Sequence, residues 1–474
     1  MNSTLPIKHT LLSLVIVSLV GCSTTGQTDY VELANRTNAT TNQQLLLNLV
    51  EQAQLDAKLQ SDHTANAEPT QQAYLTELVD VPELNHFIEL ALKNSPSLQQ
   101  NVVALNIAYA QQGVTAADRL PTVDASFSGK AEEDNSETYT TELTVGWEVD
   151  LWQKLADSSN AAIKDIASSQ ANLQGAQDLV VANIMRTWLE ISLRLQLIDI
   201  EQQRLSVLEN NETLVLDRYR AGLGSLEELD NAKTNSASTR STLADYQEQL
   251  ASSKRSLVLL SGQWTGDELT PLISDSFPQV LNPLETMPDQ NLARRPDLQS
   301  AFFNIEAEAL RTDAAYKAML PSISLSASLS DMAESPSEAL LTGPLWSALG
   351  QISAPLFQGG KLKAQAEIAE LTTEQNYWAY QEALLNAVNE VENAIGQERS
   401  LEKQQLHLTD ALQSAQRSFA SYEEKYRQGL VDIFDLLTVQ QQTYDLETQL
   451  TQTIYNRLVN RIDLGLALGL GASS

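Results

Sequence analysis

The chain carries one sequence pattern twice, about two hundred residues apart. Residues 98–121 and 298–321 share apolar positions and flanking prolines at an offset of 200. Two later pairs keep the same order, Leu151-Trp152 with Leu356-Phe357 at an offset of 205 and Tyr219–Leu223 with Tyr426–Leu430 at 207. The matched residues of the first pair are Leu98, Val102, Leu105 and Tyr109 with Leu298, Phe302, Ile305 and Ala309, and Pro96 and Pro121 with Pro296 and Pro321. We infer a tandem duplication whose unit is far longer than a solenoid repeat, so the function should arise from what two similar halves build together.

Composition limits the functions open to the chain. It has 61 acidic and 30 basic side chains and a formal net charge of −31. This charge opposes nucleic-acid binding, and it favours cations over anions in any passage through the protein. The single cysteine excludes an intrachain disulfide. The apolar residues fall in stripes, so we expect no large compact core.

The N-terminus has the features of a bacterial lipoprotein signal. Lys8 precedes an apolar run, Thr10–Val20, which has the length of a signal-peptide core and is too short to span a bilayer as a helix. The run ends in Leu19-Val20-Gly21-Cys22, which resembles a lipobox. This resemblance implies cleavage after residue 21, acylation of Cys22 and, because Ser23 follows, sorting to the outer membrane. The alternative is an ordinary signal sequence with a small buried cysteine.

Each repeat opens with a helix of about twenty residues and continues into a β-hairpin. The helix has apolar residues in a 4-3-4 spacing, typical of helices that pack side by side. After Pro121 and after Pro321 apolar and polar residues alternate strictly, which predicts a strand. A second alternating run follows at 142–151 and at 346–356. Each strand of about ten residues has the length that a tilted strand needs to cross a bilayer, although a hairpin alone fits a soluble protein equally well.

A long helical hairpin follows in each repeat. Leu155 to Tyr219 contains no proline and one glycine, and apolar residues recur there every seven positions, at Ile184, Ile191, Ile198 and Leu205, partnered by Trp188 and Leu195. At about 1.5 Å per residue, this helix is roughly 100 Å long. Gly222 predicts a left-handed cap, and a returning helix runs from about Leu226 to Leu260. The second repeat has the same plan, with a helix at about Lys361–Tyr426, a turn at Gly429 and a return to about Leu464.

Five prolines between Pro271 and Pro296 separate the repeats and predict a linker that is not helical. The stretch from residue 23 to 82 is polar, and we expect it to be irregular except for a short amphipathic helix at Leu45–Leu59. The expected organisation is a signal peptide at 1–21, an acylated polar segment at 22–82, a first repeat at 83–270, a linker at 271–293 and a second repeat at 294–470. We assign no role to residues 23–82.

Four strands are too few to close a membrane barrel. The smallest single-chain barrels use about eight strands, and an open edge in lipid leaves backbone groups without hydrogen bonds. Several chains must therefore pool their strands, and the same oligomer would array the long hairpins as the wall of a hollow cylinder. We predict a mainly α protein with β strands that acts as a conduit. A structural periplasmic lipoprotein with coiled-coil hairpins, or an adaptor, is the alternative from another class, although the lipoyl-like and barrel domains usual in adaptors are not apparent.

Four motifs point to a known family: Arg294–Leu298, Leu320–Ser326, Trp147–Trp152 and Pro355–Gly360. They resemble motifs of the outer membrane factors, the TolC-like proteins, and most closely those of the lipoprotein branch that serves resistance-nodulation-division efflux pumps. The resemblance covers about residues 75–470. It implies a homotrimer with a twelve-stranded outer-membrane β-barrel, continued into the periplasm by an α-helical barrel. Residues 23–82 depart from it, because the family's leader is short.

The same resemblance implies the exit duct of a tripartite efflux pump. Small molecules such as drugs would pass from an inner-membrane pump and a periplasmic adaptor to the exterior. The exit duct of a type I protein-secretion system has the same fold and is the nearest alternative; Arg294–Asp297 and the lipobox favour the efflux branch. The sequence does not reveal the substrates, because the pump selects the cargo.

The resemblance implies two sites at the ends of the long hairpins. The paired turns would dock on the adaptor, and the residues concerned are Tyr219, Arg220, Gly222, Leu223, Tyr426, Arg427, Gly429 and Leu430. Plain helix capping is the alternative for the two glycines. Nine residues after each turn tyrosine lies an acid, Glu228 or Asp435, at the position where the family has carboxylates that narrow the periplasmic aperture.

The aperture interpretation also has an alternative. An acid in the first turn of a helix is favoured by the macrodipole, and for Glu228 the two interpretations weigh equally. One turn further along, this chain has Asn231 and Thr438, so one family aspartate is missing and block by cations should be weaker.

Nothing in the sequence supports catalysis, a cofactor or a metal site. The four histidines, His9, His63, His86 and His407, are scattered and lack ligand spacing. Gly359-Gly360-Lys361 is not a phosphate loop, because Pro355 and Leu362 occupy positions where glycine and a hydroxyl residue are needed.

Overall fold

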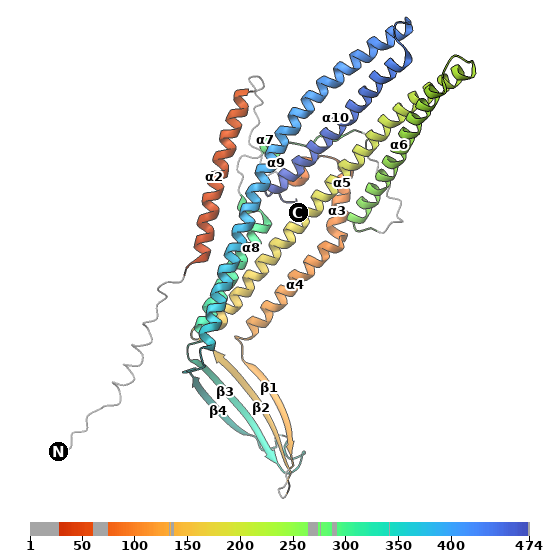
Figure 1. Ribbon diagram of the computed structural model, residues 1–474. Helices are drawn as coiled ribbons and strands as arrows, with labels where there is room; N and C mark the ends of the chain where they lie inside the picture. The colour runs from red at the N-terminus through yellow and green to blue at the C-terminus, as the bar shows by residue number, and fades with distance from the viewer. Residues whose placement is uncertain are drawn as a thin grey trace, which may run out of the picture.

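The chain forms an elongated wall of helices that continues into one β-sheet (Figure 1). The computed structural model describes residues 28–59, 74–131, 133, 137–263, 274, 276–286, 292–340 and 342–472. Within these ranges no helix is both long enough and apolar enough to span a membrane.

The duplication is visible in the helix lengths. Helices α4 (Pro96–Ala117) and α8 (Pro296–Lys317) each have 22 residues. The long helices α5 (Lys154–Arg220) and α9 (Lys361–Arg427) each have 67 residues, and the returning helices α6 (Leu226–Leu260) and α10 (Ile433–Ala467) each have 35. The predicted tandem pair of long helical hairpins is therefore confirmed.

The sheet is antiparallel, in the order β1-β2-β3-β4. Its strands are β1 (Thr122–Lys130), β2 (Thr138–Val149), β3 (Ser322–Ala333) and β4 (Leu345–Ser353). The register places apolar residues side by side on one face, since Leu143 pairs with Leu329 and Leu329 with Trp346. Both second strands end earlier than predicted, at Val149 and Ser353, but β2 also begins four residues earlier than the predicted run, so only β4 is shorter than predicted. Within the chain β1 and β4 each have one unpaired edge.

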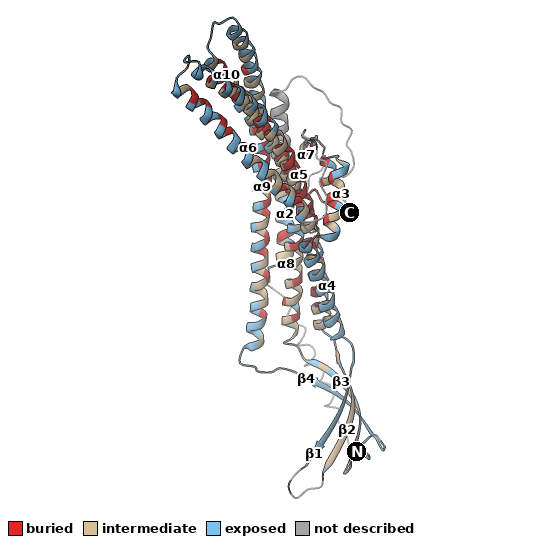
Figure 2. Cartoon of the chain, turned by 90° about the vertical axis from the view of Figure 1, so that its right-hand side faces the viewer, coloured by how far each residue is buried: buried red, intermediate tan, exposed pale blue. Residues whose placement is uncertain are grey.

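The helices pack in a fixed order along the wall. Each long helix lies against its own returning helix, α5 against α6 and α9 against α10. The two halves join where α5 contacts α8 and α10, and α8 in turn contacts α9. Figure 2 shows the free ends of the hairpins leaning to the side opposite α3 (Pro82–Asn94). The wall therefore has two distinct faces.

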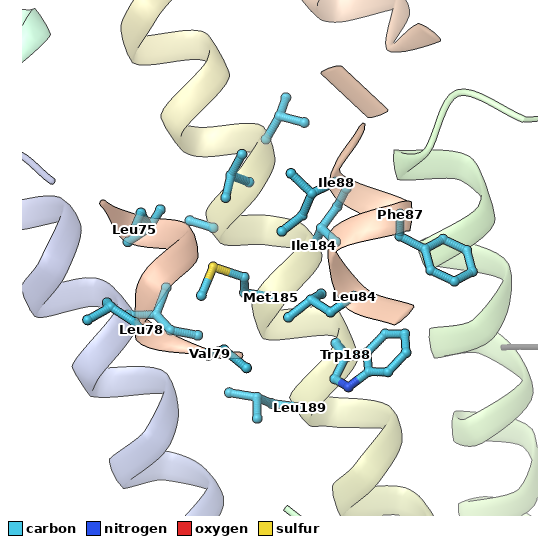
Figure 3. Close-up of a cluster of buried hydrophobic side chains, with 14 of the residues drawn as sticks. Leu75, Leu78, Val79, Leu84, Phe87, Ile88, Ile184, Met185, Trp188 and Leu189 are labelled. Carbon is cyan, nitrogen blue, oxygen red and sulfur yellow. The ribbon is translucent and has the colours of Figure 1, made fainter. Parts of the chain in front are cut away.

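Apolar side chains gather in two clusters near the middle of the wall, contrary to the expectation that no large core exists. In the first cluster Leu84, Phe87 and Ile88 of α3, a helix not predicted, pack against α5. Their partners include Ile184 and Trp188, members of the seven-residue pattern (Figure 3). The 3₁₀ helix η1 (Leu75–Leu78) completes this cluster. The second cluster joins α8, α9 and the end of α10.

Further along α5, the seven-residue pattern and the buried face separate. Ile198 and Leu205 are only half-buried, whereas Leu197 and Leu208 are buried. A straight helix drifts by about 20° per heptad relative to a strict seven-residue repeat. The buried stripe therefore moves away from the predicted positions.

The N-terminal segment is more ordered than predicted. Helix α2 spans Tyr30–Leu59 rather than only Leu45–Leu59. The Tyr30 ring lies 5.5 Å from the Tyr377 ring of α9, Ala34 is fully buried, and the backbone N of Leu292 donates to Asn42 Oδ1 at 3.1 Å. Thr- and Asn-rich sequence has low helix propensity, and these tertiary contacts override it.

The linker is also not wholly irregular. It contains one helical turn, α7 (Pro283–Thr286), and the 3₁₀ helix η2 (Leu292–Arg294), so the prediction of no helix was wrong there. Proline at the first helical position has no backbone hydrogen bond to lose. Val280 of the linker forms an antiparallel bridge with Val79, which ties the linker to the start of the first repeat.

Candidate functional site

Both long hairpins end in the same turn. Gly222 and Gly429 adopt left-handed backbone angles, with φ of 77° and 73°. The backbone N of Leu223 donates to the Arg218 carbonyl at 2.8 Å, and that of Leu430 donates to the Lys425 carbonyl at 2.9 Å. This bonding is a Schellman cap, in which glycine is favoured because side chains strain the left-handed region.

The capped turns present an open surface. Leu223 and Leu430 are 73% and 69% exposed, and Tyr219 and Tyr426 lie beside them at 41% and 39%. A Cβ atom added at either cap glycine would meet no atom within 4 Å. A hydrophobic residue at this position of the motif often packs on the last helical turn, but most of the surface of these two leucines is exposed, so the turns have apolar surface beyond what capping uses.

The two arginines of the turns have different surroundings. Arg220 lies 3.7 Å from Asp217. Arg427 is held more closely, at 2.9 Å from Glu423 and 3.1 Å from Glu424. The hydrogen bond to Glu423, together with the charge of that carboxylate, raises the pKa of Arg427 above its ordinary value. Both guanidinium groups remain largely exposed, so each can exchange its carboxylate for one on a partner.

Glu228 starts its helix as part of a capping box. The backbone N of Glu228 donates to Ser225 Oγ at 3.1 Å, and the backbone N of Ser225 donates to Glu228 Oε2 at 3.2 Å. This arrangement satisfies two helix-end donors, so the local structure explains the acid without an aperture.

Asp435 forms no capping box, although it lies in the first turn of α10, where the macrodipole favours an acid. The cap of α10 is Asp432, whose Oδ1 accepts the backbone N of Asp435 at 2.9 Å. Asp435 itself is exposed, and its carboxylate has no hydrogen bond or ion pair with any residue in the described ranges. The Thr438 hydroxyl donates to the Phe434 carbonyl of its own helix at 2.8 Å. The carboxylate of Asp435 is therefore available to face an aperture at this end of the wall.

Ion pairs between helices were not apparent from the sequence. Arg204 of α5 lies 2.6 Å from Asp445 of α10, and Arg186 lies 2.5 Å from Asp463. These pairs join the two hairpins across more than two hundred residues of sequence. No local pattern indicates partners at such a separation.

A buried network of charged side chains joins the two helices of the second hairpin, α9 and α10. Glu398 of α9 accepts from Arg457 Nε at 2.9 Å and from Arg461 Nε at 3.0 Å. Arg461 also donates to the Val280 carbonyl of the linker at 2.6 Å. The hairpin is thereby attached to the bridge between Val79 and Val280.

No group of side chains suited to hold a metal ion occurs among the described residues. Cys22, the expected acylation site, lies outside them.

Comparison with known proteins gives a consistent result. The family model described as outer membrane efflux protein matches residues 87–263 and 287–470. The probable outer membrane lipoprotein SilC of Salmonella typhimurium is 26% identical over 406 residues, which cover 82% of this chain and 86% of SilC. The cation efflux system protein CusC of Escherichia coli is 26% identical over 397 residues, which cover 82% of this chain and 87% of CusC.

Solved structures show the same fold. The crystal structure of CusC matches with a TM-score of 0.73 at 24% identity, covering 86% of this chain and 98% of that one. The outer membrane channel CmeC of Campylobacter jejuni matches with a TM-score of 0.77 at 20% identity, covering 87% and 91%. The family resemblance seen in the motifs is thus confirmed. The chain belongs to the outer membrane efflux protein family and is an export channel of the outer membrane rather than an enzyme.

Proposed function

We propose that three copies of the chain form one continuous duct, the exit channel of a tripartite efflux pump. The observation that carries this proposal is the four-stranded sheet with an unpaired edge on both β1 and β4, on a chain of this family. Backbone groups at an open edge are not satisfied by lipid, so a neighbouring chain must pair with them. Three such sheets make a barrel of twelve strands, and the paired hairpins make the periplasmic wall.

The cargo follows from the relatives only in general terms. CusC is named a cation efflux protein, and TtgC of Pseudomonas putida is named the outer membrane protein of a toluene efflux pump. We propose that small molecules reach this duct from an inner-membrane pump of the resistance-nodulation-division class through a periplasmic adaptor. The proposed organisation keeps the signal peptide at 1–21, the acylated segment at 22–82, the repeats at 83–270 and 294–470 and the linker at 271–293.

Trimer formation is tested on outer-membrane extracts. We expect a trimer-sized band in unheated samples that becomes monomeric on heating, and the purified protein should form water-filled pores in a planar bilayer. Monomeric migration without heating, or a bilayer that stays closed, would contradict the proposed duct.

We propose that the capped turns dock on the adaptor. Asparagine tolerates left-handed angles, so Gly222→Asn with Gly429→Asn should preserve the caps and place side chains on the open surface. We expect this double variant to lose export and adaptor crosslinking while it still forms the trimer. We expect the same result for Gly429→Pro, which breaks the cap. Full export by the double asparagine variant would show that the glycines serve capping only.

We propose that Asp435 narrows the periplasmic aperture, with Glu228 as a weaker second contributor. Three copies of Asp435 would gather negative charge at the entrance, which attracts cations there. We expect Asp435→Ala to change single-channel conductance and to weaken block by divalent cations. Asp410→Ala removes the same charge from an exposed site on α9 and is the matched control. Identical conductance and block in both variants would exclude the aperture role.

We propose that acylated Cys22 anchors the mature N-terminus in the outer membrane. Labelling with radioactive palmitate should be lost in Cys22→Ala. Labelling that persists in this variant would show that Cys22 is not the acylated residue.

A further inference from the structure

A recess of about 810 Å³ lies where both long hairpins meet. All of its lining comes from one chain, with Arg194 and Leu197 on α5, Tyr246 on α6, Lys403 and His407 on α9, and hydroxyl and amide side chains of α10. Its volume falls within the range of about 300–1,000 Å³ typical of small-molecule sites. Most of the lining residues are polar, and Tyr246 and Leu408 add apolar surface between them.

None of the described residues that line the recess is a carboxylate, although the chain has 61 acidic and only 30 basic side chains. Two other concavities of the wall follow the general acidity. One of about 510 Å³ is lined by four acids, as is one of about 1100 Å³. The acids of the first are Asp29, Glu306, Asp313 and Glu370, and those of the second are Asp178, Asp297, Glu390 and Asp463. The side chains that line this recess therefore carry a net positive charge, although Glu190, outside the lining, pairs with Arg194.

Its donors are available to a ligand. Lys403 is exposed and forms no ion pair with any residue in the described ranges. Arg194 lies 3.3 Å from Glu190, measured from Nη2 to the carboxylate. The Nε of Arg194 and the Thr448 hydroxyl are shielded from solvent without a hydrogen-bond partner among the described residues. An occupant reaches Lys403 directly, whereas it would reach the two shielded atoms only after the surrounding side chains shift, so Lys403 is the donor that favours an acceptor-rich occupant.

The recess lies on the face of the wall opposite α3. Trp188 of α5 packs against α3, and Leu197 follows nine residues later. At about 3.6 residues per turn, nine residues bring a side chain to the opposite side of the helix. The hairpin ends lean toward this face (Figure 2), so it becomes the inner face when the wall closes into the proposed duct.

We propose that this recess binds small organic anions, molecules with a carboxylate, sulfonate or phosphate group beside an apolar body, as they pass through the duct. Binding in the recess is independent of the proposed duct, and only the claim that the anions pass through it rests on the proposed function. The acidic wall as a whole favours cations, so an anionic cargo needs a local site of opposite sign. Lys403 supplies the unpaired charge, Arg194 supplies a second cation that it shares with Glu190, and Leu408 and Tyr246 contact the apolar body.

The probe is 1-naphthalenesulfonate, titrated calorimetrically into the full chain held in amphipol. We expect it to bind more tightly than the neutral 1-naphthalenemethanol, and the cationic 1-naphthylmethylammonium to bind more weakly than both. Lys403→Gln should lower the affinity for the sulfonate by about tenfold, the value of one charge-assisted hydrogen bond, and Lys403→Arg should retain it. Lys233→Gln, which removes the same charge from an exposed site on α6, should have no effect.

Two results would overturn the site: sulfonate affinity no higher than ammonium affinity, or equal losses in Lys403→Gln and Lys233→Gln. Because one chain supplies the whole lining, binding is measurable whether or not chains assemble. Trimer migration and bilayer conductance are measured on the same preparation. A conducting trimer that does not prefer the sulfonate refutes the recess alone, whereas a binding chain without conductance refutes the duct.

Discussion

Replacing Glu398 by alanine should loosen the second hairpin more than any exposed ion-pair substitution. Its side chain is only 7% exposed, and one carboxylate oxygen accepts from both Arg457 and Arg461, which are 17% and 18% exposed. The variant leaves two poorly hydrated guanidinium groups without this partner. Breaking a buried pair on one side typically costs about 3–5 kcal/mol.

Because the two arginines keep other contacts, we expect the loss of unfolding free energy at the lower end of this range, about 3 kcal/mol. Arg457 keeps Glu402 at 2.9 Å and Gln405 at 3.0 Å, while Arg461 keeps the Val280 carbonyl. Glu402→Ala is the matched control, because Glu402 contacts the same Arg457 but is 50% exposed. Exposed pairs contribute about 1 kcal/mol or less.

The assay is thermal unfolding of the purified protein, followed by circular dichroism at one heating rate. Glu398→Ala should lower the apparent Tm by at least twice the decrease seen for Glu402→Ala. Limited proteolysis should cut α10 of the Glu398 variant first, because α10 loses its buried contact with α9. Equal shifts for the two variants would refute the argument that burial decides the contribution of this network.

Two more substitutions test the packing around the wall's middle. Burial raises the pKa of Asp178 above its ordinary 3.8, so the stability that this group contributes is greatest at low pH and is lost as pH rises through the folded pKa. Both hydrogen bonds to Asp178 are accepted by Oδ1, which an asparagine can replace with its own amide oxygen. Asp178→Asn should therefore have a Tm at or above that of the wild type at pH 8, and the difference in Tm should be smaller at pH 5. A clearly lower Tm of the variant at pH 8 would contradict this prediction. Gly465→Ala would put a Cβ 2.9 Å from Leu78 Cδ1 and should destabilise the fold by about 1–3 kcal/mol. Gly396→Ala lies in open space on α9 and should stabilise the helix slightly. Calorimetry should show a lower Tm for the first variant and an equal or higher Tm for the second, and the reverse order would contradict the argument.

Local patterns in the sequence were sufficient for the repeating elements. A run without proline together with apolar spacing predicted α5 and α9 within one residue at each end, because backbone hydrogen bonding of a helix depends only on neighbours along the chain. Alternation predicted the strands, and Gly222 and Gly429 marked the caps because glycine alone adopts left-handed angles without strain.

Patterns gave poor guidance wherever distant contacts outweigh local preference. Helix α2 begins at Tyr30 because α9 and the linker supply partners for it, although its own sequence favours polar irregular structure. Strand β4 ends at Ser353, before the alternation itself ends. In both cases the deciding free energy comes from elsewhere in the chain.

The sequence by itself determined the duplicated plan, the lengths of the long hairpin helices and the number of strands. Only the tertiary structure decided which side chains meet across helices: that Glu398 of α9 holds two arginines of α10, and that side chains from four helices line one basic recess. The physical reason is range. Backbone conformation is set by residues a few positions apart, whereas charge pairing depends on helices brought together across tens to hundreds of residues, a distance over which sequence spacing has no fixed relation to space.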